Sequence, residues 1–200
     1  THASINKTDR ANTNSYKSKG FSFGSYVDYD LTSVISHRLG YNFAYDDTTP
    51  DDEDSKNILL VDENGKKTRS KIYSYLTFQN TDSFISPRSG YVLSIHNAYC
   101  GLGGNVRYST HSCIGKYYIP MFEKSVLLFK AEAGIMGTGA YIMDKFSLGG
   151  DNLRGFDYEG TGPRGRNSKT PNDGTALRGT RYYSGMIAYG VPLTEGIGQV

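Results

Sequence analysis

The chain of 200 residues contains no tryptophan, only two cysteines and no long apolar segment. A helix that crosses a bilayer needs roughly 20 consecutive apolar residues, and nothing in this sequence resembles such a run. Two cysteines are too few for a disulfide framework or a cysteine-based metal site. The formal net charge of +2 is too close to neutral to indicate a nucleic-acid partner. These absences argue against a helical membrane protein, a disulfide-stabilised domain and a nucleic-acid-binding protein.

The spacing of the two cysteines argues against a disulfide bond. If Cys100 and Cys113 lie on neighbouring strands of a hairpin that turns near residues 101–104, Cys113 falls well down its strand from Cys100. Their Cα atoms would then be farther apart than the roughly 7 Å that a disulfide tolerates. We therefore expect two unpaired thiols.

The composition that remains is rich in tyrosine and glycine, with 17 Tyr and 24 Gly. Only 37% of the residues are hydrophobic and the mean hydropathy is −0.51, values that on their own suggest a soluble protein. A membrane barrel that keeps polar side chains in its lumen has an equally polar average composition, so low hydropathy does not exclude the membrane.

Short runs of alternating apolar and polar residues are the strongest structural signal. Residues 125–137 place Lys130 and Glu132 on one face of an extended strand and apolar residues on the other. Two further segments, 33–46 and 180–191, show the same period. In the first, Asn42 and Asp46 lie on the polar face; in the second, Ser184 and Ala188 lie on the face opposite the large side chains. The apolar faces of the three segments are Leu127, Phe129, Ala131, Ala133 and Ile135; Leu39, Tyr41, Phe43 and Tyr45; and Tyr183, Ile187, Tyr189 and Val191.

The pattern predicts strands near ten residues long, which suit tilted membrane strands better than the shorter strands typical of soluble sheets. Short connections at 30–33, 82–90 and 120–124 contrast with long ones at 47–69 and 138–179, as in outer-membrane barrels. The predicted strands are 18–29, 33–46, 69–79, 90–100, 105–118, 125–137 and 180–191, with residues 1–10 as the tail of an earlier one.

An acidic run lies where the first long connection begins. It comprises Asp46, Asp47, Asp51, Asp52, Glu53 and Asp54. Carboxylates can bind a divalent cation, but the run lacks the glycine-centred spacing of a calcium loop. We expect a solvated, outward loop, and cation binding stays open.

The segment Leu148–Phe156 contains tight glycine turns beside one arginine and one aromatic residue. It is neither a phosphate-binding loop nor a dinucleotide fingerprint, because no helix follows it. Gly162 and Pro163 then turn the chain again. From the residues alone, the segment is a structured loop with a buried or pocketed arginine, or an ordinary exposed loop.

Residues 146–156 followed by Gly162-Pro163 resemble the loop-six signature of the BamA family: Phe-x-Leu-Gly-Gly, then a hydrophobic residue with Arg-Gly-Phe, then Gly-Pro. Further motifs follow in the order of that family and extend the resemblance over almost the whole chain. They are Gly20–Gly24, Leu39–Tyr41, Leu76–Phe78, Pro87-x-x-Gly90, Asn97–Gly104 and Tyr117–Pro120.

The resemblance implies an all-β fold: part of a transmembrane, antiparallel, up-and-down β-barrel, with about seven or eight strands of a barrel of about 16. The whole of residues 1–200 would belong to that barrel, and a loop of about 139–179 would fold inward from the outside. The periplasmic POTRA domains and the last strands of the family are absent from this sequence. The implied location is the bacterial outer membrane.

The resemblance also implies a role for the loop residues. Leu153, Arg154, Gly155 and Phe156 would form the loop-anchor motif, with turns at Gly149, Gly150, Gly162 and Pro163. The family pairs this arginine with acidic residues of the inner wall, but Ala188 stands where one of them would lie. Glu132, which faces inward by parity, is the candidate substitute partner for Arg154.

The function that the resemblance implies is an insertase that assembles β-barrel proteins into the outer membrane. Its partners would be the lipid bilayer, unfolded β-barrel clients and accessory assembly lipoproteins. We expect no enzyme activity, cofactor or metal, because no catalytic set stands out among the motifs. The alternatives are a TamA-like or two-partner-secretion translocator of the same superfamily, a passive porin or adhesin barrel, and a soluble β-sandwich enzyme.

Overall fold

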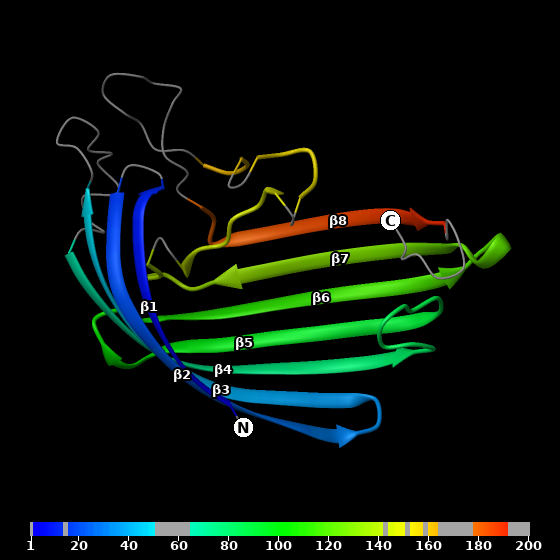
Figure 1. The fold of residues 1–200 in the computed structure, drawn as a ribbon, viewed down its shortest axis with the longest axis horizontal. Helices are drawn as coiled ribbons and strands as arrows, with labels where there is room; N and C mark the ends of the chain where they lie inside the picture. The colour runs from blue at the N-terminus through cyan, green and yellow to red at the C-terminus, as the bar shows by residue number, and fades with distance from the viewer. Residues whose placement is uncertain are drawn as a thin grey trace.

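The computed structural model describes residues 2–13, 16–50, 65–141, 144–150, 153–157, 160–163 and 178–191. Its strands form one eight-stranded antiparallel sheet whose spatial order follows the chain (Figure 1). A 3-10 helix, η2 (Phe122–Lys124), precedes β7. No helix in the described ranges is long and apolar enough to cross a membrane. The strands are β1 (His2–Thr13), β2 (Tyr16–Thr32), β3 (Ile35–Pro50), β4 (Gly65–Thr81), β5 (Gly90–Gly104), β6 (Tyr108–Pro120), β7 (Val126–Met136) and β8 (Arg181–Gly190).

The expected all-β, up-and-down architecture is confirmed, and most strands are longer than the pattern indicated. The strands run from 10 residues in β8 to 17 in β2 and β4, enough to cross a bilayer at a tilt. The segment at 1–10, which we expected to be the tail of a strand, belongs to β1, which runs on to Thr13 and pairs with β2. Apolar and polar side chains alternate only where one face of a strand is covered, whereas the backbone pairing of a strand can continue beyond that stretch.

The hairpin turn expected near residues 101–104 lies farther along the chain. β5 continues through Gly104, and the connection to β6 occupies residues 105–107. The register between β4 and β5 shifts between Arg69 and Lys71, and Gly101 and Gly104 adopt positive φ at this irregularity. A Cβ at Gly104 would lie 2.2 Å from the carbonyl oxygen of Thr68. These glycines therefore form a bulge within β5 and do not belong to the turn that follows it.

Connections at the two ends of the sheet differ in length, as the sequence indicated. The β2–β3, β4–β5 and β6–β7 connections lie at one end, on the right in Figure 1. The other end carries the β3–β4 and β7–β8 connections, which begin after Pro50 and Met136 and end at Gly65 and Arg181. This end also carries the short β5–β6 turn.

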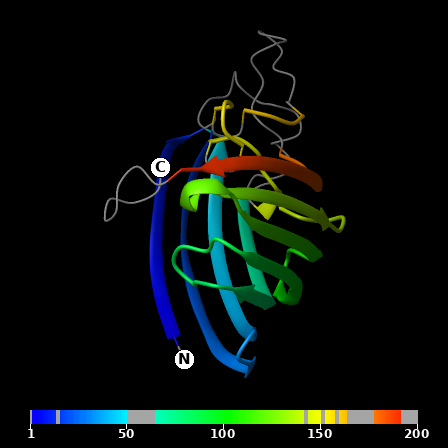
Figure 2. The same ribbon diagram turned by 90° about the vertical axis from the view of Figure 1, so that its right-hand side faces the viewer.

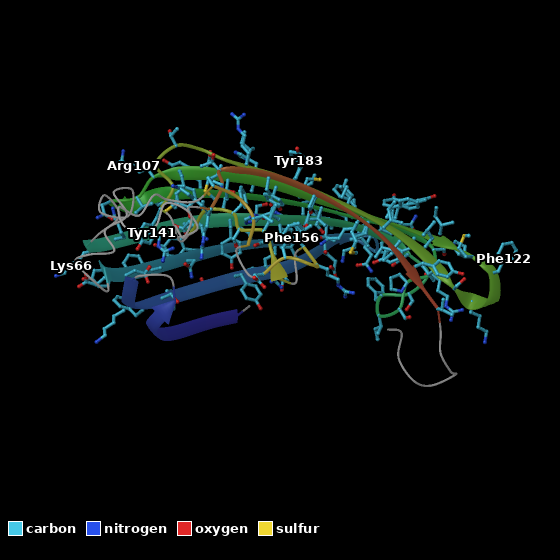
Figure 3. All side chains as sticks on the ribbon, turned by 90° about the horizontal axis from the view of Figure 1, so that it is seen from above. Lys66, Arg107, Phe122, Tyr141, Phe156 and Tyr183 are labelled. Carbon is cyan, nitrogen blue, oxygen red and sulfur yellow. The ribbon has the colours of Figure 1, made fainter. Side chains whose placement is uncertain are left out.

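The sheet is strongly curved (Figure 2). Seen from above, Tyr183 projects outward from the convex side, whereas Tyr141 and Phe156 lie on the concave side (Figure 3). We call these the outer and the inner face. Residues that lie directly opposite each other on paired strands are on the same face of the sheet. Ile187 has the parity of Tyr183 on β8 and lies opposite Phe129, which in turn lies opposite Tyr117, so all of these side chains are on the outer face.

Large apolar side chains are exposed on the outer face, which is the reverse of a water-soluble sheet. The exposed set includes Val27, Leu39, Tyr91, Tyr117, Phe129, Ile135, Tyr183, Ile187 and Tyr189. On β7 the polar positions predicted to face inward are the more covered ones, with 23% of the Lys130 side chain and 9% of that of Glu132 exposed. The predicted alternation is therefore confirmed. Apolar surface of this extent on one face needs an apolar surrounding.

A small apolar cluster covers the inner face at the end of the sheet that carries the long connections. It consists of Cys100, Val106, Tyr108, Met136, Ala140 and Tyr141, with Phe146 packed against it. Residues 140–146 belong to the β7–β8 connection. The connection therefore returns over the inner face of β5, β6 and β7 directly after β7 ends.

Both cysteines are free, as the spacing predicted. Cys100 lies opposite Tyr108, whereas Cys113 lies opposite Ile95, farther along the same hairpin. Cys100 is buried in the inner cluster and Cys113 is exposed.

The β4–β5 turn is closed by one carboxylate. Oδ1 of Asp82 accepts hydrogen bonds from the backbone N–H groups of Arg88, at 2.8 Å, and Ser89, at 3.1 Å. These two hydrogen bonds lower the pKa of the Asp82 carboxyl below its ordinary value, because they favour the charged form. Gly90, with φ of 102°, ends the turn where any Cβ would meet the backbone.

Candidate functional site

The internal loop, residues 137–180, is the candidate functional site. Two separate antiparallel bridges join its described parts, and the first of them forms the stem of the loop. Phe146 and Gly179 exchange backbone hydrogen bonds of 2.9 and 2.8 Å. In the second bridge, the backbone N–H of Thr161 donates to the carbonyl oxygen of Leu148, as does its hydroxyl group at 3.0 Å. These bonds give the loop a defined backbone instead of an open excursion.

The loop glycines predicted to form turns adopt backbone conformations that other residues adopt only with strain. Gly149, Gly150, Gly155 and Gly162 have φ of 137°, 61°, 90° and 109°. Gly150 N–H donates to the carbonyl oxygen of Phe156 at 2.8 Å, so the loop tip closes on the Gly-Gly turn. Without glycine at these positions, left-handed backbone would be unfavourable.

The anchor motif lies at the tip of this turn. Leu153 is half-buried, whereas Arg154 and Phe156 are exposed, Phe156 by 53%. Phe156 lies on the inner side of the sheet (Figure 3). Pro163 follows Gly162 and is also exposed.

The structure does not bring Arg154 and Glu132 together. The Glu132 carboxylate accepts a hydrogen bond from the Ser184 hydroxyl at 2.8 Å and pairs with the Lys130 ammonium group at 3.3 Å. Ala188, opposite Leu128 on the neighbouring strand, offers no carboxylate. The role of Arg154 as the loop anchor therefore stays a prediction.

An ion-pair network that the sequence pattern did not predict links the loop to the wall. Nη1 of Arg69 on β4 lies 2.6 Å from Oδ1 of Asp144 in the loop, and Nη2 of Arg69 pairs with Oδ2 of Asp46 on β3. We expected the acidic run to be solvated, but Asp46, which also ends the predicted strand 33–46, has only 18% of its side chain exposed because it pairs with Arg69 on the inner face. Residues 51–54 of that acidic run lie outside the described ranges.

One signal in the sequence could have identified part of this network. Arg69 has the parity of Lys71 and Tyr73 on β4 and therefore faces inward, where a charged side chain needs a partner. Asp46 has the inward parity on β3. The sequence offers no signal for Asp144, because its position depends on how the loop folds back.

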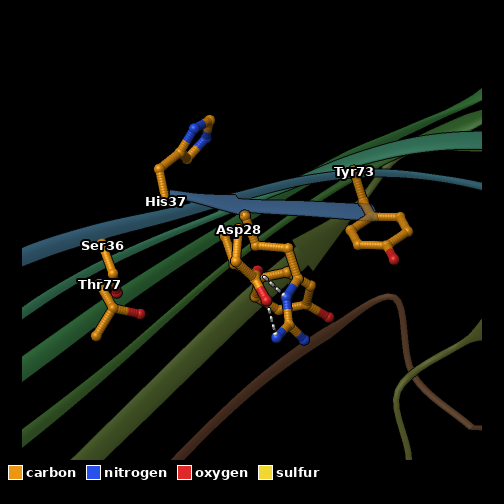
Figure 4. A pocket seen from close by; sticks show the side chains of 7 residues that line it. Asp28, Ser36, His37, Tyr73 and Thr77 are labelled. Carbon is orange, nitrogen blue, oxygen red and sulfur yellow. Dashed lines mark hydrogen bonds and ion pairs between the residues drawn. The ribbon is translucent and has the colours of Figure 1, made fainter. Parts of the chain in front are cut away.

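A second polar feature lies on the inner face near the end with the short turns. Arg38 and Asp28 form a two-pronged ion pair of 2.6 and 2.9 Å, and the guanidinium lies 4.1 Å from the centre of the Tyr26 ring. The pair borders a recess of about 570 Å³, which Tyr73 also lines and from which His37 points away (Figure 4). Four of the lining side chains carry hydroxyl groups: Ser36, Tyr73, Tyr75 and Thr77. Together with the ion pair, they make this part of the inner wall polar.

Residues 1–199 match the Omp85 superfamily domain. Over 166 residues, 78% of this chain and 37% of the relative, the sequence is 30% identical to the SAM50-like protein CG7639 of Drosophila melanogaster. It is 26% identical over 164 residues to the outer membrane protein assembly factor BamA of Neorickettsia risticii (strain Illinois), covering 80% of this chain and 22% of that protein.

Among solved structures, BamA from Haemophilus ducreyi lacking POTRA domains 1-3 shares the fold. The TM-score is 0.76 over 96% of this chain and 41% of that one, at 16% sequence identity. The chain thus spans less than half the length of each of these proteins. The expected location, the bacterial outer membrane, agrees with the family and with the apolar outer face. The chain belongs to the Omp85 superfamily and forms part of a BamA-type outer-membrane β-barrel.

Proposed function

We propose that this chain supplies wall strands and the internal loop of an insertase that assembles β-barrel proteins into the outer membrane. Its similarity to an outer membrane protein assembly factor and to a SAM50-like protein supports the proposal. The observation that carries it is the pairing of an apolar outer face with a structured loop seated on the inner face. A loop packed against the inner face and ion-paired with the wall would narrow the lumen, which favours an insertase over a wide pore.

The work would be done by strand pairing and by the bilayer, without covalent chemistry. An unpaired strand edge in lipid is costly, because its backbone N–H and C=O groups lack partners. A client strand that adds to an exposed edge of the barrel satisfies those groups in both chains. The strands described in this chain would hold the barrel in shape, and the loop would occupy part of its lumen. Unfolded β-barrel proteins are the proposed clients, and accessory lipoproteins are proposed partners.

The test is reconstitution of the whole protein in lipid vesicles. An unfolded β-barrel client is added, and its insertion is followed by the shift in gel mobility that folded barrels show without heating. Insertion well above that in protein-free vesicles supports the proposal. A translocator of the same superfamily would instead move a polypeptide into the vesicle lumen, where added protease cannot reach it. A passive porin would conduct ions and leave the client unfolded.

A further inference from the structure

We propose that Asp144, Arg69 and Asp46 form a releasable latch that holds the stem of the internal loop against the barrel wall, with Arg69 as its positioning residue. The three side chains come from the loop after β7, from β4 and from β3. The latch concerns the position of the loop, so the inference stands whether the barrel inserts clients or translocates them.

The latch is shielded from water. The exposed fractions of the Arg69, Asp46 and Asp144 side chains are 17%, 18% and 10%. A guanidinium in such a place needs charged partners, because an uncompensated buried charge is strongly destabilising. Its planar fork can bind two carboxylates at once, which a lysine ammonium group does less well. Arg69 therefore joins a loop residue to a wall residue through a single side chain.

Apolar packing on the loop supports the same docking. Tyr141 is only 2% exposed, and the centre of its ring lies 5.6 Å from Cζ of Arg69. Tyr141 and Ala140 belong to the cluster that covers the wall residue Cys100, which has no exposed surface. A loop that left the wall would uncover Cys100.

Asp46 makes the latch releasable. When the loop leaves, Asp144 moves into water with its charge hydrated, and Arg69 keeps Asp46 as its partner on the wall. Without Asp46, undocking would leave the arginine unpaired and would cost more. The two carboxylates thus have opposite effects on loop position: Asp144 holds the loop in place, and Asp46 eases its release.

The latch is tested on the whole protein in detergent micelles by the rate at which N-ethylmaleimide modifies Cys100, measured by mass spectrometry of the peptide. Asp144→Asn should accelerate the modification roughly tenfold, as expected for losing a hydrogen bond between charged groups. Asp46→Asn should leave the rate unchanged or lower it. Cys113, on the outer face and away from the loop, is the internal control: detergent covers that face in every variant, so its rate should be the same in all of them.

Equal acceleration by Asp46→Asn and Asp144→Asn would overturn the proposal. The network would then stabilise the wall as a whole, and the two carboxylates would not have opposite effects on the position of the loop. An unchanged rate in Asp144→Asn would overturn it as well. The exchange Arg69→Asp with Asp144→Arg keeps one arginine between two carboxylates and should restore slow modification of Cys100. If the Arg69 variants fail to fold, the two single asparagine variants still decide the question.

Discussion

Phe129 on β7 lies directly opposite Ile187 on β8, and both side chains are exposed on the outer face. The next residue along β8 from Ile187 toward its start, Met186, points to the inner face but is also exposed, by 39%. In a membrane, Ile187 would thus contact lipid, whereas its neighbour Met186 would face the lumen. The difference between lipid and lumen can be measured with one substitution at two neighbouring positions.

Ile187→Arg should destabilise the folded barrel by roughly 2–4 kcal/mol if the position lies near the bilayer midplane. Met186→Arg should cost clearly less, because its guanidinium faces the lumen. The measurement is a denaturant titration of folding into lipid vesicles for each full-length variant. Equal losses at the two positions would show that the assignment of the faces is wrong.

The partner of Arg154 can be tested with a double-mutant cycle of Arg154→Ala and Glu132→Gln in the whole protein. Since Glu132 is already held by Ser184 and Lys130, we expect the two effects on stability to add within about 0.5 kcal/mol. Coupling of about 1–3 kcal/mol would instead show that the two residues interact.

Gly90→Ala should destabilise the β4–β5 hairpin by more than about 1 kcal/mol. Its φ is 102°, and the added Cβ would lie 2.0 Å from the carbonyl oxygen of Asn80. Gly115→Ala is the matched control, because a Cβ there meets nothing within 4 Å. Thermal unfolding of the two variants should separate them. A loss in Gly115→Ala as large as in Gly90→Ala would count against the backbone explanation.

The turn at Asp82 should depend on pH in the acidic range. The pKa of the folded carboxyl lies below the ordinary value of 3.8, so its stabilisation of the turn is fully present above that value. It is lost as the pH falls through the lower, folded pKa. The backbone amide proton shifts of Arg88 and Ser89 should report this titration by NMR.

The control for this titration is Asp82→Asn, whose side chain cannot ionise. The two amide shifts should then lose their pH dependence in this range. A midpoint at or above 3.8 in the unchanged protein would contradict the proposed hydrogen bonding of the charged form.

The sequence by itself determined the strands, their faces and the inequality of the two ends. The spacing of side chains along a strand is local, so Phe129 and Glu132 separate onto two faces whatever the rest of the chain does. Turn residues are equally local, which is why the backbone glycines of the loop could be identified before their φ angles were known.

Only the tertiary structure decided which charged residues meet. Asp144 is 75 residues from Arg69 in the chain, and no periodicity relates them. Their contact depends on the loop returning over the inner cluster. For the same reason Glu132 faces inward as its parity predicts, yet binds Ser184 instead of Arg154. Parity fixes the face on which a side chain lies, whereas its partner on that face depends on contacts between segments far apart in sequence.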